Sequence, residues 1–302
     1  MTPEPVGLDR LGPDRAVKQV GVVGCGLMGS GIAEVCARAG LDVIVREVDT
    51  DAVAGGRARI VKSLERARRK GKLSDEAADT ALSRLTFVTD FADLSGCQLV
   101  LEAVSESEPL KLEVFATLDK VVADDAILAS NTSAIPIMKL AMATRRPEQV
   151  VGLHFFSPVP VLSLVELVSS LLTSDATAQA AHTFAEEVLG KRVIRAKDRA
   201  GFIVNALLIP YLIAAIRMLE SGYATAEDID SGMVLGCNHP MGPLALADFI
   251  GLDTTMAAAE SMYEEFKEPL YAPPPLLSRM VEAGLLGRKT GRGFYVHNGT
   301  WP

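Results

Sequence analysis

A glycine-rich turn between an apolar strand and an amphipathic helix limits the possible folds of this 302-residue chain more than any other feature. Residues 17–23 are predicted to form a buried parallel strand and residues 32–38 an amphipathic helix. Between them, Gly24-Cys25-Gly26-Leu27-Met28-Gly29 gives the pattern G-x-G-x-x-G. The first glycine suits the tight turn, the second admits a pyrophosphate to the helix N-terminus, and the third lets helix and strand pack closely. We therefore expect a dinucleotide to bind here, at Gly24, Gly26, Leu27, Met28 and Gly29.

A carboxylate stands where the ribose of such a cofactor is expected. The next apolar run, residues 42–45, is followed by Arg46 and Glu47, about 20 residues beyond the glycines. Glu47 is predicted to accept both adenosine ribose hydroxyls and to repel a 2′-phosphate, which favours NAD over NADP. Arg46 beside it would partly offset that repulsion, so the preference need not be strict.

Further strand-like runs predict an α/β fold with a doubly wound sheet of the Rossmann type. They are separated by helical stretches and cover residues 99–102, 126–129, 149–153, 163–168 and 192–194. Ligands gather at the carboxyl ends of such strands. We therefore expect residues 102–111, residues 130–133 and His154 to lie along one crevice near the glycine turn. The Ser-Asn-Thr-Ser cluster at 130–133 also fits a simple turn or cap.

One carboxylate, Glu166, interrupts the apolar run of residues 161–168. A buried unpaired carboxylate is costly, so this group is protonated, turned to water, or matched to a cation or donor. The connection Ser157-Pro158-Val159-Pro160 cannot continue a helix, so two strands could fold back and bring His154 to Glu166. Such a pair suits a general base that removes a hydroxyl proton, and a purely structural pair fits the spacing equally well.

Residues 58–72 are predicted to form a helix with a basic face, on a protein that is acidic as a whole. This face carries Arg59, Lys62, Arg66, Arg69 and Lys70. A solvated helix surface explains it, and so does a ligand that bears several phosphates.

The strand pattern stops after Asp198, and the remainder is predicted to be helical. Residues 202–220 form a long apolar run, which we expect to pack against a partner subunit as well as its own domain. Asn205 near its start could cap the helix, lie in the core or orient a substrate. We therefore predict a flexible tail at residues 1–15, a nucleotide-binding domain at 16–198, and a helical substrate and dimerisation domain at 199–302.

Composition excludes several functional classes. The net charge of -8 argues against a nucleic-acid or anionic-membrane binder, and no apolar run approaches the ~20 residues of a membrane helix. The four cysteines, Cys25, Cys36, Cys97 and Cys237, show neither metal-ligand spacing nor a disulfide framework. We therefore expect no metal and a reducing compartment, the cytoplasm.

Taken together, these motifs resemble those of the L-3-hydroxyacyl-CoA dehydrogenases, especially the bacterial short-chain 3-hydroxybutyryl-CoA dehydrogenases. The resemblance runs from about residue 17 to residue 296. Besides the glycine turn, it is carried by Leu128-Ala129-Ser130-Asn131-Thr132-Ser133, His154-Phe155-Phe156 with Pro158, Glu166, Gly201-Phe202-Ile203-Val204-Asn205, His239-Pro240-Met241-Gly242-Pro243 and Gly291-Arg292-Gly293-Phe294-Tyr295. The chain departs from the family at Ser157, where Asn is usual, and at Ala200, where Pro is usual.

The resemblance implies roles for individual residues. His154 would take the 3-hydroxyl proton as general base, and Glu166 would orient it and balance its charge. Ser133 would hydrogen-bond the 3-oxygen, and Asn205 would position the acyl thioester. The other implied contacts are, for NAD, Glu47 at the adenosine ribose and Glu106, Lys111 and Ser133 near the nicotinamide, and, for coenzyme A, Ser63, Lys70 and Lys289.

The expected activity is the NAD-dependent oxidation of (S)-3-hydroxyacyl-CoA, with 3-hydroxybutyryl-CoA as the short-chain case, to 3-oxoacyl-CoA, and the reverse reduction. The resemblance also implies a homodimer formed through the helical domain. One alternative is the same chemistry on an acyl-carrier-protein thioester or a dicarboxylic acyl-CoA. Others are a dehydrogenase of free acids, which would need a cationic clamp, and a catalytically silent NAD-binding protein.

Overall fold

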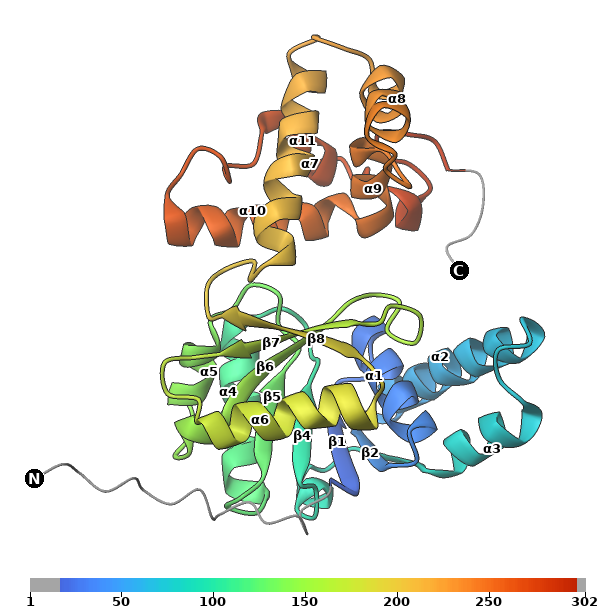
Figure 1. Cartoon of the computed structure of the whole chain (residues 1–302), viewed down its shortest axis with the longest axis vertical. Helices are drawn as coiled ribbons and strands as arrows, with labels where there is room; N and C mark the ends of the chain where they lie inside the picture. The colour runs from blue at the N-terminus through green and yellow to red at the C-terminus, as the bar shows by residue number, and fades with distance from the viewer. Residues whose placement is uncertain (1–16, 298–302) are drawn as a thin grey trace, which may run out of the picture. The chain divides into compact units, whose positions relative to one another are not determined.

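The structure is a computed structural model that describes residues 17–297, and the tail expected at residues 1–15 lies outside the described residues. The described chain divides into two compact units between Asp198 and Arg199, both drawn in Figure 1. The first unit alternates strands and helices, whereas the second is helical.

Strands and helices of the first unit follow one another in the order expected for an α/β fold. The strands are β1 (Gln19–Val23), β2 (Asp42–Arg46), β3 (Leu85–Val88), β4 (Leu99–Glu102), β5 (Ile127–Ser130), β6 (Val150–Phe155), β7 (Leu164–Ser169) and β8 (Arg192–Lys197). The helices are α1 (Leu27–Arg38), α2 (Thr50–Arg69), α3 (Asp75–Ser83), α4 (Glu108–Val121), α5 (Ile137–Met142) and α6 (Asp175–Thr183), with short turns η1 (Phe91–Leu94), η2 (Pro147–Gln149) and η3 (Phe184–Val188).

The strands of the described first unit form one eight-stranded sheet in the order β3-β2-β1-β4-β5-β6-β7-β8. Strands β1 to β6 run parallel to their neighbours, β7 runs antiparallel to β6, and β8 is parallel to β7. The strand order reverses between β1 and β4, and in such sheets ligands bind at the carboxyl ends of the strands beside this reversal. The predicted doubly wound sheet is confirmed.

Helices cover both faces of the sheet (Figure 1). On one face, α1 and α6 share a hydrophobic core with alternate strand residues such as Leu101 and Leu153. On the other face, α5 lies over Gly152, where an added Cβ would meet the side chain of Ile137. Side chains alternate between faces along a strand. His154 therefore lies on the same face as Gly152, and so does its strand partner Glu166.

The predicted strands are present with shifted ends, and one strand was not predicted. The strands β5, β6, β7 and β8 each end one to three residues beyond the predicted runs. The unpredicted strand is β3, which lies at the edge of the sheet and has only half-buried or exposed side chains. It lacks the continuous apolar run of the central strands, and that run was the signal used to find them. Helix α2 is also longer than expected at its start.

The second unit consists of α7 (Val204–Glu220), α8 (Ala226–Cys237), α9 (Pro243–Ile250), α10 (Leu252–Phe266), α11 (Pro275–Glu282) and the short turn η4 (Arg288–Thr290). Two buried carboxylates organise it. Asp248 accepts hydrogen bonds from the N–H groups of Phe294 and Tyr295 at 2.9 and 3.0 Å. Asp230 accepts hydrogen bonds from the N–H groups of Leu244 and Ala245 at the start of α9 and from the hydroxyl of Tyr295. The motifs at 239–243 and 291–295 thus have a structural role within this unit.

Candidate active site

The glycine turn forms a backbone cradle at the start of α1. Gly24 has a φ of 87°, and an added Cβ there would meet the backbone of Ala103 in the loop after β4. A Cβ on Gly29 would overlap the carbonyl oxygen of Gly24, whereas a Cβ on Gly26 would meet no described atom within 4 Å. Among the described residues, no side chain caps α1, so its first N–H groups can receive an anion. The open space at Gly26 fits a pyrophosphate.

Glu47 and Arg59 hold this turn from two sides. The carboxylate of Glu47, just after β2, accepts the N–H of Cys25 at 2.5 Å. The carbonyl of Cys25 accepts two hydrogen bonds from the guanidinium of Arg59, at 3.1 and 2.8 Å. Burial, together with the nearby Glu47 carboxylate, raises the pKa of the Cys25 thiol to about 12. The thiol is therefore neutral at physiological pH and packs as an apolar group.

His154 lies between a carboxylate and a hydroxyl. Its Nδ1 is 2.7 Å from Oε2 of Glu166, and its Nε2 is 2.9 Å from Oγ of Ser133. Glu166 is 0% exposed and His154 is 4% exposed. Because a carboxylate only accepts hydrogen bonds, Nδ1 carries the proton, and Nε2 of the neutral ring then accepts from the hydroxyl of Ser133. The predicted hairpin is present, and it leaves Nε2 able to take a proton from an alcohol.

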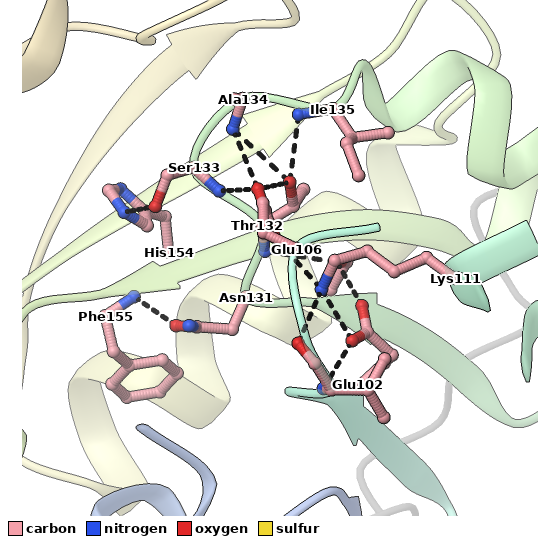
Figure 2. A network of polar contacts seen from close by, with 12 residues as sticks. Glu102, Glu106, Lys111, Asn131, Thr132, Ser133, Ala134, Ile135, His154 and Phe155 are labelled. Carbon is pink, nitrogen blue, oxygen red and sulfur yellow. Dashed lines mark hydrogen bonds and ion pairs between the residues drawn. The ribbon is translucent and has the colours of Figure 1, made fainter. Parts of the chain in front are cut away.

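A second polar cluster lies beside Ser133 (Figure 2). Lys111 is 1% exposed and forms ion pairs with Glu102 at 2.6 Å and with Glu106 at 3.2 Å. Oε1 of Glu106 accepts hydrogen bonds from the hydroxyl of Thr132 at 2.5 Å and from the N–H of Ser133 at 2.9 Å. A continuous series of contacts therefore joins the buried ammonium group of Lys111, through Glu106, to Ser133, which contacts the imidazole of His154.

The segment after β5 is fixed at both ends. Oδ1 of Asn131 accepts the N–H of Phe155 at 2.9 Å, which ties the segment to β6 (Figure 2). The hydroxyl oxygen of Thr132 accepts the N–H of Ile135 at 2.9 Å. The Ser-Asn-Thr-Ser run is therefore a hydrogen-bonded turn, and Ser133 at its end contacts His154.

Helix α2 carries two of the residues expected at coenzyme A. Lys70 is exposed at the end of the helix, and Ser63 is half-buried beside Glu34, whose pKa is raised by burial. Of the predicted basic face, Arg59, Lys62, Arg69 and Lys70 are exposed and Arg66 is half-buried. Arg59 also donates hydrogen bonds to the carbonyl of Cys25 in the glycine turn. The predicted basic face is therefore present, and one of its members also contacts that turn.

Asn205 and Lys289 belong to the second unit. Asn205 is half-buried in the first turn of α7, and because Ile203 occupies the N-cap position, the expectation that Asn205 caps this helix is wrong. Lys289 forms an ion pair with Asp253 at 2.5 Å. A phosphate bound at Lys289 would therefore share the ammonium group with that carboxylate or displace it.

Glu102 and Thr132 lie in the segments 102–111 and 130–133 expected along the crevice, but neither was assigned a role of its own from the sequence. The available signal was a charged residue at the end of the apolar run 99–102, with a lysine in the helix that follows. Within residues 17–297, no group of His, Cys, Asp and Glu side chains could hold a metal ion. No helix in the same range is long and apolar enough to cross a membrane.

Comparisons with known proteins give the same family for both units. The family model for the NAD binding domain of 3-hydroxyacyl-CoA dehydrogenase matches residues 19–199, and the model for its C-terminal domain matches residues 201–297. A 3-hydroxybutyryl-CoA dehydrogenase from Mycobacterium tuberculosis is 61% identical over 283 residues, which cover 93% of this chain and 99% of the relative.

Solved structures agree with these matches. The crystal structure of FadB2 from M. tuberculosis superposes with a TM-score of 0.93 at 61% identity, covering 94% of this chain and 100% of that one. The structure of the (S)-3-hydroxybutyryl-CoA dehydrogenase PaaH1 from Ralstonia eutropha gives a TM-score of 0.89 at 46% identity, with 94% and 100% covered.

Proposed function

The chain belongs to the 3-hydroxyacyl-CoA dehydrogenase family, and from this premise we propose how its own residues perform the reaction. It is an NAD-dependent dehydrogenase that interconverts (S)-3-hydroxybutyryl-CoA and acetoacetyl-CoA. One observation carries the assignment of its residues. The contact of Nδ1 of His154 with Glu166 leaves Nε2, which contacts the hydroxyl of Ser133, able to accept a proton.

His154 is the general base of the oxidation. When the 3-hydroxyl group of the substrate lies at Nε2, the ring takes its proton and becomes imidazolium. Glu166 then faces a positive charge at 2.7 Å from a fully buried position, where such an attraction is stronger than in water. As the proton leaves, the electron pair of the C3–H bond can depart as hydride. NAD, when bound, supplies the acceptor for that hydride.

Ser133 positions the reacting oxygen. Its hydroxyl is 2.9 Å from Nε2 of His154, so an oxygen within hydrogen-bond distance of both groups marks the place of the substrate 3-oxygen. In the reduction, His154 returns its proton to that oxygen while Ser133 donates a hydrogen bond to the developing alkoxide. Asn205 is assigned to the acyl thioester, as the resemblance to the family implies.

The first unit fits NAD in three places. The backbone cradle has room at Gly26 for the pyrophosphate, and the first turn of α1 offers N–H groups to it. Glu47 offers its carboxylate to the adenosine ribose. Glu106 and Lys111 are assigned to the nicotinamide end, because Glu106 contacts the N–H of Ser133. The residues assigned to the cradle are Gly24, Gly26, Leu27, Met28 and Gly29.

Ser63, Lys70 and Lys289 are assigned to the nucleotide part of coenzyme A. A test is to compare KM for acetoacetyl-CoA with KM for acetoacetyl-pantetheine, which lacks the nucleotide. Lys70→Ala and Lys289→Ala should raise only the KM for the CoA thioester, while Lys72→Ala, an exposed lysine just beyond α2, should change neither value. Equal KM values for the two thioesters in all variants would contradict the assignment.

Assays of turnover and NADH binding also test the alternative substrates and the catalytically silent protein. Tight NADH binding without turnover of either thioester would favour a carrier-protein thioester, a dicarboxylic acyl-CoA, a free acid or a silent protein. Titration of NADH fluorescence separates that outcome from a chain that binds no cofactor at all. Rapid turnover of acetoacetyl-CoA would exclude the silent protein.

The first unit, in this proposal, binds NAD, and the second contributes substrate contacts and a homodimer interface. Helix α7 supports the interface, because Leu207 is 74% exposed and Ile203 and Met218 are also exposed on this helix. Sedimentation that gives only a monomer at micromolar concentration would contradict the dimer. The cytoplasmic location predicted from the cysteine pattern remains a prediction, which cell fractionation tests.

A further inference from the structure

Glu102 has no part in the mechanism above, although it is ionic and 0% exposed. Its carboxylate accepts hydrogen bonds from Nζ of Lys111 at 2.6 Å, from the hydroxyl of Ser130 at 2.6 Å and from the N–H of Val104 at 2.7 Å. A carboxylate without water is costly unless donors and a cation surround it. Three separate donors therefore hold this group in one position.

Its place in the sheet brings Glu102 to the site. It is the last residue of β4, paired with Val23 of β1 and with Ser130 of β5. From its carboxylate, contacts run through Lys111 and Glu106 to the backbone of Ser133 (Figure 2). Ser133 thus receives two series of contacts, one through this cluster and one through the imidazole. The first series ends at the N–H of Ser133, and the second ends at its hydroxyl, which marks the place of the reacting oxygen.

Charge balance makes the cluster depend on Glu102. Two carboxylates face one ammonium group, which gives a formal charge of -1. Without the carboxylate of Glu102, the buried ammonium group of Lys111 would have only Glu106 as its anion among these three residues. Glu106 accepts hydrogen bonds from the N–H groups of Ser133 and Ala134 at 2.9 and 3.2 Å. If the carboxylate of Glu102 were lost, Glu106 would move toward Lys111, and these two hydrogen bonds would weaken.

The same charge acts on the cofactor. A hydride acceptor must lie within a few ångströms of the carbon whose oxygen touches His154 and Ser133. In the proposed function, the anionic cluster, which contacts the N–H of Ser133, would therefore lie close to a bound nicotinamide ring. That ring is cationic in NAD+ and neutral in NADH, so a neighbouring negative charge favours the oxidised form.

We infer that Glu102 is a positioning residue that acts through Lys111 and Glu106: it holds Ser133 at the reacting oxygen and favours binding of NAD+ over NADH. This inference rests on the proposed function. It assigns a role to a residue that touches neither substrate nor cofactor, and the charge effect gives a readout that a purely structural role would not move.

The test compares Glu102→Gln with Glu108→Gln. Glu108 is an exposed carboxylate of the same segment, paired with Lys139 at 2.7 Å, and is the matched control for the loss of one charge. Dissociation constants for NADH and NAD+ come from fluorescence titration and competition. In Glu102→Gln, the ratio of the NAD+ constant to the NADH constant should rise about five-fold, and kcat should fall about ten-fold or more. Both should stay at wild-type values in Glu108→Gln.

A double variant covers the case in which Glu102→Gln does not fold. The variant that combines Glu102→Gln with Lys111→Met has no ammonium group in the cluster. Glu106 is then the one charged residue of the three, so the formal charge is again -1. The ratio of dissociation constants should return to the wild-type value while kcat stays low, because Glu106 has lost its anchor. A wild-type kcat in the double variant, or an unchanged ratio in a folded Glu102→Gln variant, would overturn the inference.

A measurement without cofactor separates this inference from the proposed function. The amide NMR signals of Ser133 and Ala134 should shift in Glu102→Gln and not in Glu108→Gln, and unshifted signals would overturn the positioning role. If the wild type binds NADH but does not turn over acetoacetyl-CoA, the proposed function fails, and the amide signals and the binding ratio still decide the role of Glu102. If it binds neither cofactor form, the function and the charge effect both fail.

Discussion

Replacing Glu166 by Gln removes one charge from the imidazole partner and leaves its shape nearly unchanged. Oε2 of Glu166 is 2.7 Å from Nδ1 of His154, and the residue is 0% exposed. A hydrogen bond to a charged group contributes about 1.5–3 kcal/mol, with the upper end expected where water is excluded. About 2.7 kcal/mol lost from the transition state corresponds to about a 100-fold fall in rate. We therefore expect kcat for oxidation of (S)-3-hydroxybutyryl-CoA to fall about 100-fold.

The substrate KM should change by less than about two-fold, because a fully buried Glu166 side chain cannot touch the substrate. Glu186→Gln is the control, since Glu186 forms a similar pair with His182 on the surface, at 2.8 Å. Glu166→Asp keeps the negative charge but at a longer distance from Nδ1 of His154. Its kcat should therefore lie between the values of Glu166→Gln and the wild type. A Glu166→Gln variant with native melting temperature and a kcat within three-fold of wild type would show that the charge of Glu166 does not stabilise the transition state.

Three further predictions concern the cofactor cradle and the buried ion pairs. Gly29→Ala should weaken NADH binding more than ten-fold, because its Cβ would overlap a carbonyl oxygen of the turn, whereas Gly232→Ala on open helix surface should leave binding unchanged. Wild type should bind NADPH at least ten-fold more weakly than NADH, and titrations with Glu47→Gln should show a smaller difference. Asp119→Asn should lower the free energy of unfolding by about 2 kcal/mol at pH 7, because buried Arg146 loses its carboxylate partner. Although burial opposes it, hydrogen bonds from two arginines lower the pKa of Asp119. This difference should therefore be complete above about pH 5 and decrease as the pH falls through the folded-state pKa, which urea unfolding at a series of pH values below 7 would show.

Long apolar runs and glycine spacing were sufficient to predict a doubly wound sheet and the segments of its central strands. The short proline-containing connection also indicated that two strands could fold back and bring His154 to Glu166, and the structure has these two residues opposite each other. The edge strand β3 was not predicted because its residues are only partly buried or exposed. The periodicity of apolar residues along a sequence reflects which side chains are buried, and an edge strand has few buried side chains.

The polar cluster was harder to predict for a different reason. Lys111 was assigned from the family resemblance, but its burial at 1% and its pairing with Glu102 follow from the way α4 packs onto the end of β4. A single sequence does not say which exposed-type residue turns inward. Arg59 is exposed, as helical spacing predicted, but the spacing did not show that it also donates to the carbonyl of Cys25.

The central claim is tested most directly by following NADH absorbance with acetoacetyl-CoA in the wild type, His154→Ala and His182→Ala. We predict rapid oxidation of NADH by the wild type and by His182→Ala, whose imidazole pairs with Glu186 on the surface. In His154→Ala the rate should fall about 1,000-fold. A His154→Ala variant that keeps the wild-type rate, or a wild type that binds NADH and never oxidises it, would contradict the account.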